Sequence, residues 1–217
     1  MSVVTISREF GSEGSTVARR VAQNLDYYFV DKDVMGQVLI QYGFVEFNQE
    51  YDSVPSFWNG FDSRRVEMVG MLNRVIRALA CHNNVVILGR GSFAVLDDFA
   101  DVLNVRIQAP LPLRIKRVIA REHIDNFEQA EALVAENDKM RSTFIEWFYN
   151  VPWDTASAFD IVLDTGKVPA ELAVDWLVDT VVAMEETKTG GEQTTRTLEV
   201  DPVLADLVAK VLEAQFA

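Results

Sequence analysis

The chain has 217 residues and a formal net charge of −13; 49% of its residues are hydrophobic and 24% are charged. These are the proportions of a globular protein, and they exclude a fibre, a coiled coil and wholesale disorder. No apolar run approaches the ~20 residues of a membrane span, and no secretory leader pattern is visible, so we expect a cytoplasmic protein without a membrane partner. The single cysteine, Cys81, excludes an internal disulfide and a cysteine-based zinc cage. The acidic charge argues against nucleic-acid polymers as partners.

Short apolar runs alternate with helical patterns along most of the chain. In the first half, strands are predicted over residues 2–6, 27–30 and 85–88, and helices over 17–25, 34–42 and 64–81. In the second half, the predictions are strands over 102–107 and 160–163, helical patterns over 113–149 and 169–186, a polar linker over 187–197 and a short helix over 202–216. This alternation predicts an α/β fold of three layers (αβα), in which helices cover both faces of a mostly parallel sheet. Ligands of such sheets bind at the carboxyl ends of the strands.

Two aromatic groups interrupt this pattern. The first lies in the irregular stretch 44–61 and forms either a stacking wall for a nucleobase or the small core of an inserted lobe. The second, within 144–149, is predicted to hold a helix against the core, with Phe144 and Trp147 as packing residues.

The turn after the first predicted strand has the composition of a phosphate-binding loop. Glycines let the backbone approach an anion closely, and the free N–H groups of the following helix face it. The residues that provide these features are Gly11, Ser12, Glu13, Gly14, Ser15 and Thr16. With Ser15 at the hydroxyl position of the pattern G-x-x-x-x-G-K-[ST], the chain departs from it at Arg8, Glu13 and Gly14. The turn is therefore either an unusual phosphate-binding loop or a merely tight connection.

Two arginines follow predicted strands. Arg8 could reach bound phosphates, or pair with Glu9 or Asp164. Arg90 lies between Gly89 and Gly91, and its planar guanidinium could grip a phosphate bidentately or contact a base. The alternative for Arg90 is a structural ion pair with Asp31 or Asp164.

Acidic and hydroxyl groups near the same strand ends could serve a magnesium ion. Asp31 and Asp33 follow the second predicted strand and either hold a magnesium-bound water, polarise an acceptor, or cap the next helix. Ser15 or Thr16 is the natural hydroxyl for the magnesium shell. No acidic residue directly follows the predicted strand 85–88, because Gly89 and Arg90 occupy those positions.

Arginines recur on the helical segment after residue 111. Arg114, Arg117 and Arg121 share one helix face at ~100° per residue. Like charges on one face cost stability unless an anion meets them, so the face either binds an anion or is solvated. Further on, Asp138 and Arg141 are three residues apart and could form a helix pair worth only ~0.3 kcal/mol.

Several of these segments, in this order, resemble the cytidylate kinase-like family, a branch of the P-loop nucleoside monophosphate kinases. The segments are VVTISREFGSEGSTVARRVAQNL, YYFVDKDVM, VVILGRGSFAVL, VRIQAPLPLRIKRV, the Asp138/Arg141 pair and DIVLDTG, and the resemblance covers residues 2–185. The family carries S-R-E-x-G-S-G-G and usually lacks the loop lysine, so Gly14 is a family trait. Glu13, in place of a glycine, and Ser15, where a basic residue is common, are departures of this chain.

The resemblance implies a P-loop NTPase fold and a nucleotide-dependent phosphotransferase. A kinase-like domain over 1–186 would contain a helical nucleotide-binding insertion at about 43–82 and an arginine-bearing lid at about 112–150, followed by a linker and helix over 187–217. ATP with Mg²⁺ would donate its γ-phosphoryl group to a nucleoside monophosphate such as CMP or dCMP. The loop would hold the donor, Arg90 the acceptor, and the lid arginines, Arg141 included, would close over the transferring group.

Two other functions remain open from the sequence. The missing lysine and Glu13 are compatible with a catalytically weak or inactive nucleotide-binding or regulatory module of the same fold. A Rossmann dinucleotide binder is a further alternative, because Gly11 and Gly14 fit part of G-x-G-x-x-G and Asp31 follows at about the ribose-binding distance.

The negative charge is unevenly distributed. Residues 170–217 contain ten acidic and three basic residues, a net −7, whereas residues 111–121 contain four basic residues and no acid. The overall charge therefore does not argue against a nucleotide held under a basic lid. The last predicted helix, 202–216, has an apolar stripe that docks either on its own domain or on a second subunit, which makes a homo-oligomer possible.

Overall fold

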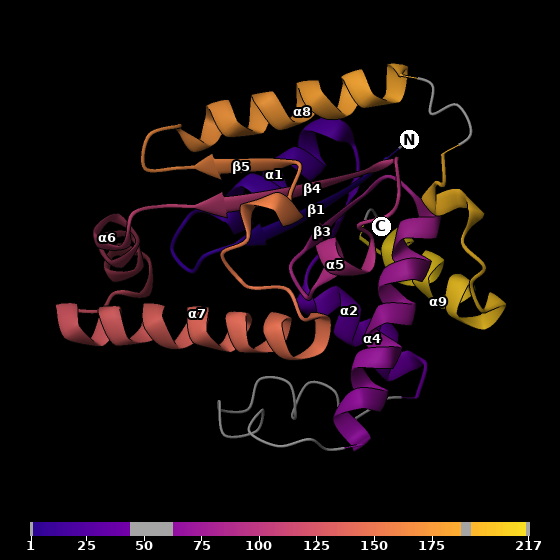
Figure 1. Ribbon diagram of the computed structural model, residues 1–217, viewed down its shortest axis with the longest axis horizontal. Helices are drawn as coiled ribbons and strands as arrows, with labels where there is room; N and C mark the ends of the chain where they lie inside the picture. The colour runs from indigo at the N-terminus through magenta and orange to yellow at the C-terminus, as the bar shows by residue number, and fades with distance from the viewer. Residues whose placement is uncertain (1, 44–62, 188–191, 216–217) are drawn as a thin grey trace.

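The computed structural model describes residues 2–43, 63–187 and 192–215 (Figure 1). Five parallel strands form one sheet in the order β2-β3-β1-β4-β5. The strands are β1 (Val3–Arg8), β2 (Tyr28–Val30), β3 (Val85–Leu88), β4 (Val102–Gln108) and β5 (Ile161–Asp164). The order places β3 between β1 and β2, unlike the order 3-2-1-4-5-6 of dinucleotide-binding folds. The Rossmann alternative is therefore wrong.

Helices cover both faces of this sheet. They are α1 (Gly14–Leu25), α2 (Lys32–Gln41), α4 (Ser63–His82), α5 (Ser92–Val95), α6 (Leu111–Glu122), α7 (Phe127–Tyr149), α8 (Ala170–Glu186) and α9 (Pro202–Glu213), with short 3-10 turns at Ala156–Ala158 and Thr195–Thr197. Figure 1 shows α8 on one side of the sheet and α7 on the other, with α6 beyond the arrowheads of β4 and β5. The predicted three-layer α/β fold is confirmed.

The central strand explains how the layers hold together. Val4 and Ile6 of β1 pack with α1 and α8, whereas Val3 joins the core formed with α2, α4 and α9. All three side chains have no exposed surface, since a parallel strand is covered on both faces. The strand is therefore buried along this run instead of alternating with exposed residues, and the one polar side chain in the run, Thr5, donates a hydrogen bond to Asn104.

The first strand is longer than predicted. Ser7 and Arg8 continue β1, because they pair in register with Arg106 and Ile107 of β4. The predicted strand ended at Ile6, where the apolar run ends. The neighbouring strand, and not the polarity of the segment, determines where β1 ends, and Arg8 consequently stands on the rigid sheet.

The last helix packs on its own domain. Four apolar residues of α9 are buried in the core that also contains α2 and α4: Leu204, Val208, Val211 and Leu212. The apolar stripe thus has a partner within the same chain. The predicted aromatic lobe at 44–61 lies outside the described residues. Within the described ones, no helix is long and apolar enough to cross a bilayer.

Candidate functional site

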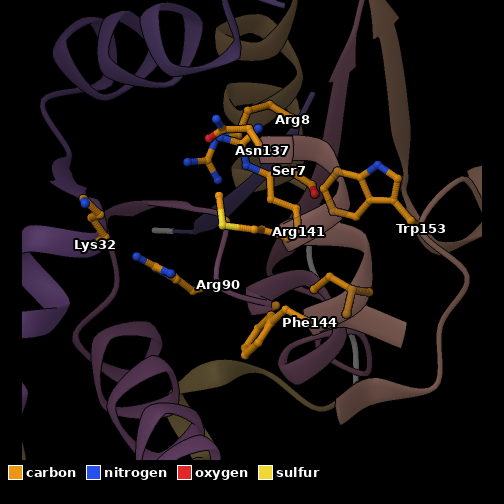
Figure 2. Close-up of a pocket in the computed structure, with 12 residues that line it drawn as sticks. Ser7, Arg8, Lys32, Arg90, Asn137, Arg141, Phe144 and Trp153 are labelled. Atoms are coloured by element: carbon orange, nitrogen blue, oxygen red, sulfur yellow. The ribbon is translucent and has the colours of Figure 1, made fainter. Parts of the chain in front are cut away.

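Basic side chains from four elements surround one cavity at the carboxyl edge of the sheet. Arg8 ends β1, Lys32 begins α2, Arg90 follows β3 and Arg141 projects from α7, and all four line a cavity of about 290 Å³. Figure 2 shows Lys32 and Trp153 entering from opposite sides. The cavity lies where ligands of open parallel sheets bind. Its charge makes it suited to an anion.

The rest of the lining is mostly apolar and comes from α7 and the connection to β5. Met140, Phe144 and Ile145 project from α7, and Trp153 completes the wall. Ser7 and Asn137 add hydrogen-bonding groups. A cavity that combines several cations with an apolar wall can bind a molecule with both an anionic group and a flat or apolar body.

The turn after β3 presents Arg90 to the cavity. Gly89, Arg90 and Gly91 all have positive φ, at 76°, 59° and 73°. At Gly91 a side chain would also collide with Tyr149, whose Cε2 lies 2.3 Å from the position a Cβ would occupy. The turn therefore needs glycine at position 91 for its conformation and for the contact with α7.

The β1–α1 loop is tied down by its own polar groups. The Ser12 hydroxyl donates to the carbonyl oxygens of Glu9 (2.9 Å) and Ile107 (3.1 Å), and the Ser12 carbonyl accepts from the Thr165 hydroxyl (2.8 Å). Ser15 and Thr16 are exposed in the first turn of α1. The first N–H groups of a helix have no intrahelical partner, so this end of α1 can receive an anion. Residues 11–16 are not among those that line the cavity.

Arg117 compensates the unusual acid of this loop. Its guanidinium lies 2.8 Å from the Glu13 carboxylate, and it donates to the Thr165 hydroxyl (2.9 Å) and carbonyl (3.0 Å). Glu13 precedes α1 with a left-handed φ of 64°, and its side chain makes no capping hydrogen bond. The carboxylate is therefore turned toward α6, where an arginine meets it.

The other two lid arginines have different surroundings. Arg114 is 8% exposed and pairs with Glu9 (3.3 Å) and Asp138 beneath the loop. Arg121 is exposed, pairs with Glu122 (2.8 Å) and stacks on the Phe10 ring at 4.8 Å. The spacing of the three arginines places them on one helix face, but each makes different contacts in this structure. None of them is among the residues that line the cavity.

Asp138 joins the lid to the loop. Its carboxylate accepts a hydrogen bond from the Phe10 amide (2.8 Å), pairs with Arg114, and lies 3.5 Å from Arg141. The predicted helix pair of Asp138 and Arg141 is thus present as part of a larger network. Through it, the α7 helix that lines the cavity is connected to the β1–α1 loop.

A second buried network fixes the aromatic wall. Arg106 of β4 is 4% exposed, donates to the Trp153 carbonyl and lies 4.7 Å from the centre of its ring. Its other partner is Glu9, at 3.9 Å. Burial lowers the pKa of the Arg106 guanidinium from its usual value, and the Glu9 carboxylate acts in the opposite direction. Glu9 thus connects Trp153 to the loop.

The two acids after β2 lie at the start of α2. The Asp31 carboxylate accepts from the backbone amides of Asp33 (3.0 Å) and Val34 (3.2 Å), so it caps this helix. It also lies 3.8 Å from Arg19. Asp33 is exposed in the first turn. Among the described residues, no three His, Cys, Asp or Glu side chains are grouped as a metal site.

The sequence missed several residues that line the cavity, among them Lys32, Asn137 and Trp153. Lys32 follows the strand-end acid directly, and the rule that ligands bind after strand ends would have found it. Asn137 and Trp153 gave no such signal, because their positions depend on how α7 and the β5 connection fold back over the sheet.

Comparison with known proteins identifies the family. The model of the cytidylate kinase-like family matches residues 3–167. The chain belongs to this family. The matched range includes every residue that lines the cavity, while α8 and α9 lie beyond it. The resemblance found in the sequence is confirmed.

Curated proteins and a solved structure are similar to this chain. The chain is 25% identical over 170 residues to the cytidylate kinase of Methanosarcina barkeri, covering 76% of this chain and 87% of the relative. It is 28% identical over 179 residues to that of Staphylothermus marinus, covering 79% and 91%. A solved structure of an uncharacterized protein from Eubacterium ventriosum has a TM-score of 0.69 at 22% identity, covering 84% of this chain and 99% of that one. This last likeness supports the fold alone.

Proposed function

We propose that this family member is a nucleotide kinase that transfers the γ-phosphoryl group of ATP to the phosphate of a nucleoside monophosphate, giving ADP and a nucleoside diphosphate. The observation that carries the proposal is the cavity with four basic residues from four elements at the carboxyl edge of the sheet. CMP or dCMP is the first candidate acceptor, because the curated relatives are named cytidylate kinases.

The cavity is the acceptor site in this proposal. Lys32 and Arg90 would hold the acceptor phosphate, since both line the cavity from the segments that follow the adjacent strands β2 and β3. The base would lie against the wall of Phe144 and Trp153, where stacking and apolar contact are available. Arg141 would meet the group in transfer, because α7 carries it over the cavity.

The donor would bind at the β1–α1 loop. The N-terminal amides of α1 and the backbone around Gly11 and Gly14 suit the phosphates of ATP. Mg²⁺ keeps several waters and needs few protein ligands when phosphates supply the rest, so the exposed hydroxyl of Ser15 or Thr16 is a sufficient protein ligand. The ion would neutralise phosphate charge during transfer.

A second candidate is a nucleotide-binding module without turnover. The observation in its favour is the combination of Gly14 at the lysine position with a loop carboxylate, Glu13, already paired to Arg117. In that reading the same cavity and loop bind nucleotides but do not catalyse transfer.

One experiment separates the two. The full chain is incubated with ATP, Mg²⁺ and each of CMP, dCMP, UMP, AMP and GMP, and ADP formation is followed while calorimetry measures binding. Turnover with a cytidine nucleotide that falls at least about 100-fold in Arg90→Met supports the kinase. Lys210→Met, which removes an exposed cation of α9 paired to Asp206, is the matched control. Binding without turnover supports the module, and absence of binding to every nucleotide refutes both.

The proposed function also leads to expectations about the location and partners of the protein. A nucleotide kinase of this kind would work in the cytoplasm on free nucleotides, without nucleic-acid polymers or membranes. Self-association through α9 remains a prediction, and its buried stripe confines such a contact to the exposed side of that helix.

A further inference from the structure

We propose that Arg8 takes the place of the missing loop lysine, and that position 14 is glycine because the stem of Arg8 occupies the space beside it. The inference rests on the proposed function, and it names the residue that provides the loop cation. It predicts that the side chain of Arg8 and a lysine at position 14 exclude each other.

The first observation is the space at position 14. Gly14 begins α1 without a positive φ, so its backbone does not require glycine. A Cβ there would lie 2.5 Å from the Arg8 Cβ, 3.1 Å from its Cγ and 3.2 Å from the Ile107 Cβ, so the contact with the Arg8 Cβ is the severe one. Distances under 3.0 Å between such atoms do not occur in relaxed structures, and the Cβ of Arg8 cannot move away while β1 keeps its register with β4. A lysine at position 14 therefore cannot coexist with the stem of Arg8.

The second observation is the course of the Arg8 side chain. At its far end, Nη1 lies 2.0 Å from the position that a Cβ of residue 89 would occupy. The side chain thus runs from the start of α1, beside Gly14, to the turn after β3, beside Gly89. Arg8 lines the same cavity as Arg90 and Arg141, as Figure 2 shows.

The chemistry of this position suits a phosphoryl group in transfer. A guanidinium is charged at every relevant pH and presents a planar fork of donors to phosphate oxygens. Arg8 would form no covalent bond and move no proton; it would stabilise the negative charge on the oxygens of the transferred group. Because its stem starts at the loop and its tip ends at the cavity, it can reach the group between donor and acceptor.

The packing premise is tested by a double-mutant cycle that involves no nucleotide. Gly14→Ala is measured alone and in an Arg8→Gly background by thermal unfolding. We expect it to lower the Tm of the wild-type chain by about 4 °C or more, and to lower the Tm of Arg8→Gly distinctly less, because the collision with the Arg8 Cβ is then gone and only the 3.2 Å contact with the Ile107 Cβ remains. Arg8→Ala is the matched control, since it keeps the Cβ that collides and therefore should not relieve the loss. An equal loss in all backgrounds would overturn the proposal.

The charge exchange is tested by moving the cation. Arg8→Gly should lower kcat by about 100-fold. The kcat of Arg8→Gly/Gly14→Lys should be at least about tenfold higher than that of Arg8→Gly. Arg8→Met, which keeps the buried stem without the charge, gives the same loss if Arg8→Gly folds poorly. Lys210→Met again controls for loss of an exposed cation.

Binding of inorganic tripolyphosphate, measured by calorimetry, keeps the inference separate from the proposed function. If the wild-type chain turns over no nucleotide, the proposed kinase fails, but the cycle and the tripolyphosphate affinities still decide the inference. It is supported if affinity falls in Arg8→Met and returns in Arg8→Gly/Gly14→Lys. It is overturned if Arg8→Met binds tripolyphosphate like the wild type.

Discussion

The backbone and the charge of Glu13 can be tested separately. Its φ of 64° is left-handed, which costs an L-residue about 1–2 kcal/mol and costs glycine nothing. A glycine at this position would avoid that cost, but it would lose about 0.5–1 kcal/mol of stability because glycine gives up more conformational freedom on folding. The ion pair with Arg117 joins side chains that are 40% and 22% exposed, and such pairs contribute about 0–1 kcal/mol.

These magnitudes predict an order of stability. Glu13→Gln loses the ion pair and keeps the strained backbone, whereas Glu13→Gly loses both. We therefore expect Glu13→Gly to be more stable than Glu13→Gln by about 1 kcal/mol, with both variants close to the wild type. Urea unfolding with a shared slope measures the difference. The reasoning is refuted if Glu13→Gln is as stable as Glu13→Gly, because the left-handed backbone would then cost no more than the roughly 0.5–1 kcal/mol that glycine loses to the freedom of the unfolded chain.

The charge gives a second, independent result. Both variants remove a carboxylate from the anion-binding end of α1 and leave Arg117 without that partner. We expect tripolyphosphate to bind both several-fold more tightly than the wild type at low ionic strength, with the gain shrinking at 0.5 M salt. An unchanged affinity at low salt would show that Arg117 already cancels the charge of Glu13.

Three further predictions concern packing and ionisation. Gly91→Ala should destabilise the fold by about 1–3 kcal/mol, because it combines a positive φ with a collision against Tyr149, and Tyr149→Ala should recover part of this in urea unfolding. Leu204→Ala, at a side chain 1% exposed in the core beside α4, should cost about 2–5 kcal/mol, while Val203→Ala, at 63% exposure, should cost under about 0.5 kcal/mol; similar losses would contradict the docking of α9. Burial and the hydrogen bond to Glu185 raise the pKa of Tyr27 to about 12 from 10.0, so its contribution to stability is complete below pH 10 and is lost as the pH rises toward 12. Unfolding at pH 9 and 11.5 should therefore show a smaller alkaline loss for Tyr27→Phe than for the wild type.

Much of the fold followed from periodicity, and the differences have physical causes. The lid was predicted as one interrupted helical stretch, but it forms α6 and α7, separated where His123 is left-handed and Asn126 caps the second helix. Trp147 was predicted to pack against the core, and this is wrong: it is 55% exposed, while Phe144 on the same helix is 4% exposed. α7 presents only one face to the sheet, and apolar character alone does not show which residues lie on that face.

The site was partly predictable for a similar reason. Strand ends identified Arg8 and Arg90, because the carboxyl edge of a parallel sheet is fixed by topology. The contact of Glu13 with Arg117 was not predictable, since it depends on α6 crossing the start of α1. The sequence shows the carboxylate of Glu13 in the loop, and only the fold shows that Arg117 is its partner.

Two partly buried carboxylates give the loop, the lid and the cavity wall a common support. Glu9 pairs with Arg114 and Arg106, and Asp138 pairs with Arg114 and receives the Phe10 amide. Removing either carboxylate takes an ion-pair partner from a buried guanidinium, Arg106 or Arg114, and breaking a buried pair typically costs about 3–5 kcal/mol. A change at either end is therefore felt at the other: a ligand that draws Arg141 away from Asp138 also alters the partner of the loop amide. In this way a protein with a net charge of −13 keeps basic groups positioned for an anion, because Glu9 and Asp138 hold the surrounding elements in place while basic residues line the cavity.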